Sequence, residues 1–253
     1  MKWFLQNISN KVAFAARNPR YALEAVIREF VLADERFLAK ITGVSAKRVR
    51  SYLDEPINTP CFADHLRQAQ ELFRRLSVES ADLFAKKVLN QYAAVRALAP
   101  DVVVETGIAN GVSSAYLLLA LQKNGRGSLH SIGLADPAYL PPGKSPGWLV
   151  PDWLRPGWQI HIGDARTILP ELLRRLGKIG IFIHDSLHTY DQMMREFETA
   201  YPHIESGGLL LADDASWNDS FHDLARKVAA TEAQILRGVG FLKKRHSSAD
   251  ALA

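Results

Sequence analysis

Cysteine is almost absent from this chain of 253 residues, because Cys61 is the only one. An intrachain disulfide and a cysteine-rich metal site are therefore excluded, and the composition suits a reducing compartment. Long hydrophobic runs are absent as well. No stretch of about 18 apolar residues could cross a membrane, and polar residues interrupt the N-terminal apolar positions before a signal-peptide core could form. We therefore expect a cytoplasmic protein without a membrane span.

A strong excess of one charge is also missing, since the net charge is only +4. The charge is uneven, however: residues 1–100 carry 16 Lys and Arg against 10 Asp and Glu, and residues 101–253 carry 15 against 17. A basic half suits nucleic acid or an anionic membrane surface, but solvated helix faces explain it more simply. With 47% hydrophobic residues, the chain can bury the core of one large domain, with or without a subdomain.

The spacing of apolar residues divides the chain into two parts. Residues 1–98 repeat apolar positions every three or four residues, which predicts a helical N-terminal cap. In residues 99–253, short β-branched runs alternate with helical patterns, which predicts an α/β domain whose mainly parallel sheet has helices on both faces. We expect strands at 102–106, 128–134, 158–162, 179–184 and 208–212, and helices that begin near Val112, Arg166, Thr189 and Ser220. Ligands of such sheets bind at the carboxyl ends of the strands.

One long segment interrupts this alternation. Residues 135–157 contain six prolines together with Trp148 and Trp153. Long loops inside compact domains are usually functional or disordered, and the aromatic residues argue against disorder. We expect a lid or a substrate wall here, and a simply packed surface loop is the alternative.

Acidic side chains follow two neighbouring strands of the predicted sheet. Asp185 comes directly after the fourth strand, and Asp213 and Asp214 come after the fifth. Carboxylates that lie this close together raise one another's pKa unless a cation neutralises them. Oxygen-rich sites suit Mg²⁺, Mn²⁺ or Ca²⁺ better than zinc. The alternative is that Asp185 and Asp213 cap helices. Strand alternation places His184 on the opposite face, where we expect a structural role.

A glycine-containing turn follows the first strand. Glu105 ends that strand, and Gly107, Ala109 and Gly111 lead into the next helix. Glycines at such a turn allow a ligand to approach the backbone closely. A dinucleotide fingerprint requires glycines at 107, 109 and 112, and this pattern does not supply them. NAD and FAD are therefore not expected.

Four segments carry a family resemblance. "VVVETGIANGVSSAYLLLAL", "HIGDA", "FIHDSLHTYD" and "GGLLLADD", in this order, resemble the class I S-adenosylmethionine-dependent methyltransferases, in the branch with cation-dependent small-molecule and sugar O-methyltransferases. The resemblance implies a Rossmann-like fold, S-adenosyl-L-methionine as cofactor, and Mg²⁺ or Mn²⁺. It also implies a small-molecule substrate, a sugar or another natural product.

The resemblance assigns roles to individual residues. The turn from Glu105 to Gly111 would hold the methionine part of the cofactor, so that a branched side chain at 111 would fill the methionine channel. Asp164 would lie near the adenine. Asp185, with Asp213 and Asp214, would hold the cation and grip the substrate hydroxyl. His188 would take the proton of that hydroxyl as a general base.

One position departs from the family pattern. Gly133 stands where the family has an acidic residue that binds both ribose hydroxyls. Asp136, three residues later, is the expected substitute. If it does not substitute, the chain is a degenerate protein that keeps the fold without methylating.

The N-terminal part offers a rival interpretation. Residues 37–55 resemble a helix-turn-helix whose second helix carries Lys47, Arg48 and Arg50. A helical cap over an active site explains the same pattern, so nucleic acid is not the favoured partner. The amphipathic start of the chain would suit a homo-oligomer contact through Trp3, Phe4, Leu5, Ile8 and Val12.

Overall fold

The fold is built on one mainly parallel sheet. The computed structural model describes residues 34–75, 83–136, 138 and 140–245, so the proposed N-terminal contact lies outside the described residues. Seven strands follow the order β3-β2-β1-β4-β5-β7-β6. β1 to β5 are parallel, and β7 runs antiparallel to both β5 and β6. The strands are β1 (Val102–Thr106), β2 (Ser128–Gly133), β3 (Trp158–Ile162), β4 (Ile179–His184), β5 (Ile204–Ala212), β6 (Ala233–Leu236) and β7 (Val239–Lys243).

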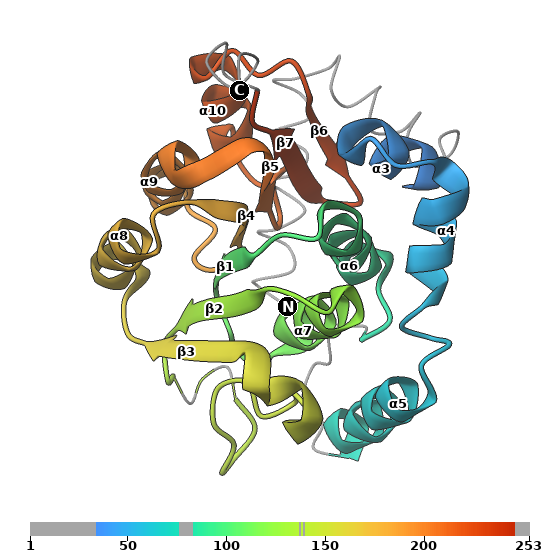
Figure 1. Ribbon diagram of the computed structural model, residues 1–253. Helices are drawn as coiled ribbons and strands as arrows, with labels where there is room; N and C mark the ends of the chain where they lie inside the picture. The colour runs from blue at the N-terminus through green and yellow to red at the C-terminus, as the bar shows by residue number, and fades with distance from the viewer. Residues whose placement is uncertain (1–33, 76–82, 137, 139, 246–253) are drawn as a thin grey trace.

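Helices cover both faces of the sheet (Figure 1). Strand residues alternate between the faces, so that Val103, Ile181 and Leu209 join one hydrophobic cluster, while their neighbours in sequence join the other. The first face is covered by α6 (Lys86–Leu98) and α7 (Val112–Asn124), with α3 (Asp34–Thr42), α4 (Ala46–Asp54) and α5 (Pro60–Arg75) outside them. The second face is covered by α8 (Ala165–Leu176), α9 (Tyr190–Ala200) and α10 (Ser220–Lys227). Two short 3-10 helices are η2 (Asp152–Gly157) and η3 (Tyr201–His203).

The sequence-based α/β prediction is confirmed, with one omission. All five expected strands are present, and β5 begins earlier than expected, at Ile204. The omitted elements are β6 and β7, which form a hairpin across Arg237 and Gly238. Both turn residues have positive φ, 51° and 86°, as a tight hairpin turn requires. An Arg-Gly pair lacks the Asn-Gly or Asp-Gly signature that would have revealed it.

The described N-terminal helices share one hydrophobic core with the sheet. A single cluster of buried residues joins Phe37 of α3, Leu66 of α5 and Tyr92 of α6 to Leu209 and Phe241 of the sheet. This helical region therefore covers the first face of the α/β domain and is part of its core. None of the helices in the described part of the chain is long and apolar enough to span a membrane.

Candidate active site

The glycine-containing turn lies at the carboxyl end of β1, between β2 and β4. Gly107, Ala109 and Gly111 all have positive φ, at 91°, 39° and 84°. Gly111 is also the residue before α7, and its position provides no side-chain cap for that helix. The first backbone N–H groups of α7 therefore face the carboxyl edge of the sheet without a side-chain partner, as an anionic or polar ligand requires.

Each glycine of this turn is needed for a contact within the protein. A Cβ on Gly107 would lie 1.8 Å from the carbonyl oxygen of Asp185, so the ends of β1 and β4 meet there. A Cβ on Gly111 would lie 2.8 Å from the Cα of Gly147 and 3.1 Å from Val150 Cγ2. A side chain at 111 would therefore collide with the 147–150 segment.

Glu105 is enclosed by hydroxyl groups. Its side chain is fully buried, and its carboxylate accepts hydrogen bonds from Ser114, from Ser131 at 2.6 Å and from Ser113 at 3.2 Å. Burial raises the pKa of Glu105, and the three serines oppose that rise. In this structure Glu105 ties β1 to β2 and to the start of α7, so it supports the turn from beneath.

The proposed ribose and adenine residues lie at the ends of β2 and β3. Asp136 is partly exposed, and its Oδ1 accepts a hydrogen bond from the backbone of Ala138 at 2.9 Å. Asp164 is the N-cap of α8 and accepts from the backbone of Arg166 at 2.8 Å. Leu134 and Ile162 expose 59% and 52% of their surfaces at these strand ends. This edge therefore offers apolar surface beside two acidic side chains.

The structure brings three polar side chains together at the ends of β4 and β5. One ligand atom from each of Asp185, His188 and Asp213 lies within 4.8 Å of the other two. Asp213 is 3% exposed, and its Oδ1 has no hydrogen-bond partner among the described residues. Asp214 is not part of this group. The backbone of Asp214 has a φ of 48°. We had expected Asp214 as the third member of the cluster, and His188 is the third member instead.

The donor set of this cluster fits a divalent cation. The cluster offers two carboxylates and an imidazole, which are ligands that Mn²⁺ and Mg²⁺ accept. One of the carboxylate oxygens, Oδ1 of Asp213, is buried without a hydrogen-bond partner among the described residues. Desolvation and the adjacent Asp213 raise the pKa of Asp185 well above its usual range, and Lys87 opposes this rise. A bound cation would remove that destabilisation of the charged pair.

Helix capping does not account for these acidic residues. Thr189 caps α9 through its side chain, and Asp219 is the residue that precedes α10. Asp185 and Asp213 hold neither position. The capping alternative is therefore not supported.

Lys87 is a site residue that the sequence did not reveal. Its Nζ lies 2.7 Å from Asp213 Oδ2, although α6 precedes the whole α/β domain. Lys87 stands in the first turn of α6, which contains no acidic residue, and the helix dipole disfavours a cation there. That mismatch was the one available signal that Lys87 has a partner outside its own helix.

His188 lies beside the acidic pair as a neutral ring. Its Nε2 is 3.7 Å from Asp185 Oδ1, and its Nδ1 is buried without a hydrogen-bond partner among the described residues. Burial, together with His184, lowers the pKa of His188 to about 4, against the opposing effect of Asp213. The ring is thus unprotonated near neutral pH and able to accept a proton or a metal ion.

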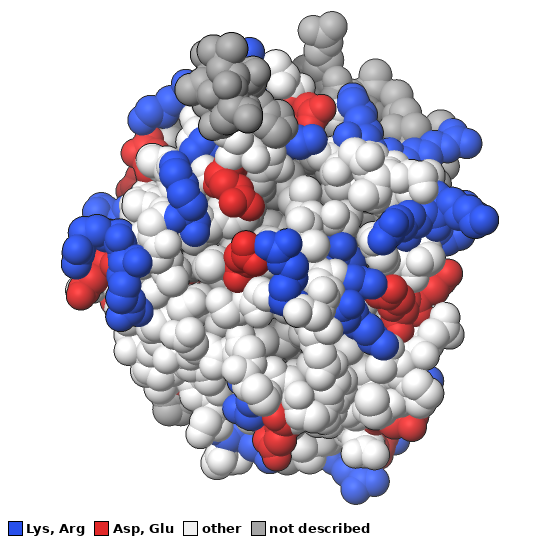
Figure 2. Space-filling view, in the orientation of Figure 1, with Lys and Arg blue, Asp and Glu red and all other residues white. Residues whose placement is uncertain are grey.

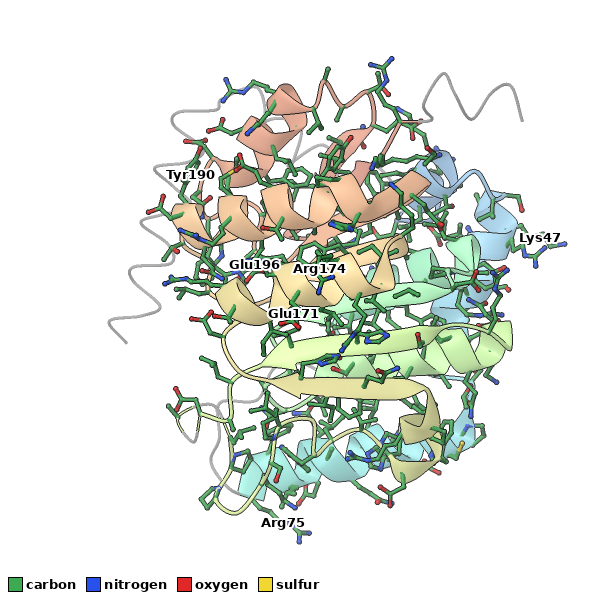
Figure 3. The ribbon with its side chains drawn as sticks, turned by 60° about the vertical axis from the view of Figure 1, so that its left-hand side comes forward. Lys47, Arg75, Glu171, Arg174, Tyr190 and Glu196 are labelled. Carbon is green, nitrogen blue, oxygen red and sulfur yellow. The ribbon has the colours of Figure 1, made fainter. Side chains whose placement is uncertain are left out.

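A buried carboxylate holds the strand ends in place from the other face. Glu196 projects from α9 toward the sheet (Figure 3) and is 1% exposed. It accepts hydrogen bonds from Thr106 at 2.6 Å, His184 at 2.6 Å, Ser186 at 2.7 Å and Gln192 at 2.7 Å. His184 therefore has the structural role expected of it, because it anchors the end of β4 to α9.

The proline-rich segment forms a fixed wall beside the glycine turn. Trp148 Nε1 donates to Asn110 Oδ1 at 2.7 Å, and the backbone of Leu149 donates to the carbonyl of Asn110 at 3.1 Å. His65 of α5 contacts the carbonyl oxygen of Leu149 at 2.6 Å. Leu149 and Val150 are buried. This part of the segment is packed on both sides, which argues against a lid and leaves a substrate wall or a packed surface loop.

The basic helix of the rival interpretation is α4. Figure 2 shows Lys and Arg gathered over α4 at the right and over α8 at the left, with acidic residues between them. Lys47 points outward from α4 (Figure 3). Arg48 donates to the hydroxyl of Tyr52 at 2.6 Å, and Arg50 pairs with Glu35 at 3.2 Å. Two of the three basic side chains therefore have partners on the protein itself.

Comparison with known proteins identifies the domain. Residues 104–215 match a family model described as a methyltransferase domain, so the methyltransferase expected from the sequence is confirmed. None of the curated proteins matches this chain by sequence.

Solved structures share the fold at low identity. One is the O-methyltransferase TomG from Streptomyces achromogenes, involved in tomaymycin synthesis and solved with SAM: it is 17% identical over 72% of this chain and 90% of its own, with a TM-score of 0.55. Another is the SAH-bound methyltransferase PaMTH1 from Podospora anserina, 13% identical over 79% and 95%, with a TM-score of 0.52. The Rossmann-like class I methyltransferase fold is thereby confirmed.

Proposed function

We propose that this chain, whose residues 104–215 form a methyltransferase domain, transfers a methyl group from S-adenosylmethionine to a hydroxyl of a small molecule, such as a sugar or another natural product. A divalent cation assists the reaction. One observation carries the proposal: Asp185, His188 and Asp213 converge within 4.8 Å at the carboxyl edge of the sheet. This edge also bears the glycine turn, and a methyltransferase places its reacting groups there.

The cofactor, when bound, supplies an activated methyl group. The turn at Gly107, Ala109 and Gly111 would hold its methionine part against the uncapped start of α7. Asp136 would bind the ribose, because the position of the usual acidic residue is occupied by Gly133. Asp164 would lie near the adenine. The exposed side chains of Leu134 and Ile162 support this assignment, since an adenine ring prefers apolar surface. TomG and PaMTH1, solved with SAM and SAH, support the choice of cofactor.

Asp185 and Asp213 would hold the cation, which supplies a Lewis acid that lowers the pKa of a hydroxyl. Their carboxylates would fix the position of that ion at the carboxyl edge of the sheet. Asp214 would contribute only charge from a greater distance. Oxygen donors of this kind suit Mn²⁺ as well as Mg²⁺.

His188 would act as the general base. Its ring is neutral above a pH of about 4, and it lies next to the atoms that would hold the substrate oxygen. We assign the ring to proton transfer because the two carboxylates already offer the hard oxygen donors that these ions prefer. Trp217 packs against the ring at a tilt of 51°, with 5.2 Å between the ring centroids, and this contact holds the orientation of the ring.

A second function is favoured by Gly133. A Cβ there would lie 2.9 Å from Ile108 Cγ1, so the usual ribose-binding carboxylate has no room. If Asp136 does not replace it, the chain keeps the fold and does not methylate.

Calorimetry with S-adenosylhomocysteine separates the two functions. An active enzyme binds it stoichiometrically, and transfer of a labelled methyl group to a panel of sugars and phenols should then fall with EDTA and recover with Mg²⁺ or Mn²⁺. Absence of binding at millimolar ligand would contradict the proposal and leave the non-methylating function. Binding of S-adenosylhomocysteine together with methyl transfer that is unchanged in EDTA would contradict only the role of the cation.

A further inference from the structure

The acidic pair already has a cation of its own. The ammonium of Lys87 lies 2.7 Å from Asp213 Oδ2, and the carboxylate of Asp213 is 5% exposed while the Lys87 side chain is 39% exposed. A lysine that is paired directly with a carboxylate keeps its positive charge at physiological pH.

Two effects of Lys87 on a metal ion oppose one another. A hydrogen bond that fixes a ligating carboxylate strengthens metal binding, commonly about 10- to 100-fold. A single positive charge close to a divalent ion weakens binding of that ion, because the two repel one another. The repulsion is twice that felt by a monovalent ion, and poorly hydrated surroundings screen it little. The orienting effect needs only a donor, whereas the repulsion needs the charge.

The structure favours repulsion as the larger effect. Lys87 bonds to one oxygen of the same carboxylate whose other oxygen is buried and unpartnered. An ion at that second oxygen would share a single carboxylate with the ammonium. The backbone of Asp213 is already held by a hydrogen bond to the carbonyl of His184 at 2.8 Å, so the carboxylate depends less on Lys87 for its position.

We propose that Lys87 is an internal competitor of the divalent cation. Its ammonium neutralises the carboxylate of Asp213 in the absence of an ion and thereby keeps the affinity for the metal low. This inference rests on the cation site of the proposed function. The exposed part of the Lys87 side chain allows the ammonium to move toward solvent when an ion binds. Metal would then bind weakly to the free protein, and the ion would be exchangeable.

The test measures Mn²⁺ binding to the full chain by electron paramagnetic resonance, without cofactor or substrate. Lys87→Met removes the charge and keeps the length of the side chain. It should lower the dissociation constant for Mn²⁺ at least tenfold. Lys86→Met is the matched control, because Lys86 is exposed in the same helical turn, and it should change the constant by less than twofold.

Two further variants make the outcome decisive. Lys87→Gln keeps a donor and should also tighten binding, which guards against a folding defect in Lys87→Met. Adding Asp213→Asn to Lys87→Met should abolish the gain. Weaker or equal Mn²⁺ binding in both Lys87 variants, with clear binding by the wild type, would overturn the competitor and leave the cation site intact. Absence of binding in all variants at millimolar Mn²⁺ would overturn the cation site as well.

Discussion

Gly133 lies directly against Ile108. A Cβ on Gly133 would be 2.9 Å from Ile108 Cγ1 and 3.0 Å from the backbone nitrogen of Ile108. The end of β2 and the turn after β1 are therefore closer than a side chain at 133 permits. This contact gives the departure from the family pattern a physical reason, because the space for a carboxylate is taken by the turn itself.

Restoring the acidic residue should therefore harm the protein. Gly133→Asp is expected to lower the free energy of unfolding by about 1–3 kcal/mol, the usual effect of overpacking, without improving the affinity for S-adenosylhomocysteine. Urea denaturation and calorimetry check both effects. Leu134→Asp is the control for the urea measurement alone, since Leu134 is 59% exposed and the same charge should leave the free energy of unfolding nearly unchanged there. A stable Gly133→Asp protein with tighter binding would contradict this account.

Asp136 should carry the ribose contact instead. Asp136→Ala is expected to weaken S-adenosylhomocysteine binding by about 1.5–3 kcal/mol, the range for a hydrogen bond to a charged group. The thermal midpoint should change little, because the hydrogen bond that Asp136 accepts from the backbone of Ala138 is exposed. Isothermal calorimetry of the two proteins decides the matter. Equal affinity would mean that the ribose is held by other groups.

The two ends of α7 offer a matched pair of glycines. Gly111 and Gly125 have φ values of 84° and 68°, but only Gly111 has a close neighbour, since a Cβ on Gly125 meets nothing within 4 Å. Gly125→Ala should cost about 1–2 kcal/mol for backbone strain alone. Gly111→Ala should cost clearly more and should release the 147–150 segment. Thermal melts and limited proteolysis of that segment measure this, and equal costs would refute the packing role.

The positions of the acidic pair followed from the sequence because strand ends and residue alternation are local properties. Asp185 and Asp213 come directly after runs of apolar residues whose parallel pairing the pattern predicts. Lys87 could not be placed in this way, since the face of a helix that meets a strand more than 100 residues later depends on tertiary packing. The contacts of Gly111 with Gly147 and of Gly133 with Ile108 are equally non-local. Sequence patterns therefore predicted which edge of the sheet carries the site, but not the contacts that other segments of the chain make there.

The histidine pair on β2 and β3 should make stability depend on pH. His130 and His161 stack with ring centroids 5.5 Å apart, and burial with the nearby His161 lowers the pKa of His130 to about 4. Between pH 4 and the unfolded value of 6.5, the unfolded chain binds a proton that the folded chain does not. Stability should therefore fall as the pH drops through that window, by up to about 1.4 kcal/mol per pH unit.

His130→Leu should flatten that part of the pH dependence. Urea denaturation of wild type and variant at several pH values between 4 and 7.5 isolates the contribution, because other titrating groups are common to both proteins. An identical slope in the two proteins would show that His130 is not the cause.

Charge removal in the acidic cluster separates the metal site from the base. Asp185→Asn should abolish metal-dependent transfer, whereas His188→Ala should retain Mn²⁺ binding and lose roughly 10²- to 10⁴-fold in rate. Asp191→Asn is the control, because Asp191 is exposed in the following helix outside the cluster.

Stability gives an independent view of the same variant. The pKa of Asp185 is raised by burial and by Asp213, so its charge is disfavoured in the folded protein, and Asp185→Asn should melt at or above the wild-type temperature. A capping role predicts near-normal activity, since Asn caps helices as well as Asp does. A purely structural acid predicts a large loss of stability. Lower activity with unchanged or higher stability shows that Asp185 serves function rather than the fold, and loss of Mn²⁺ binding in the same variant then identifies it as a cation ligand.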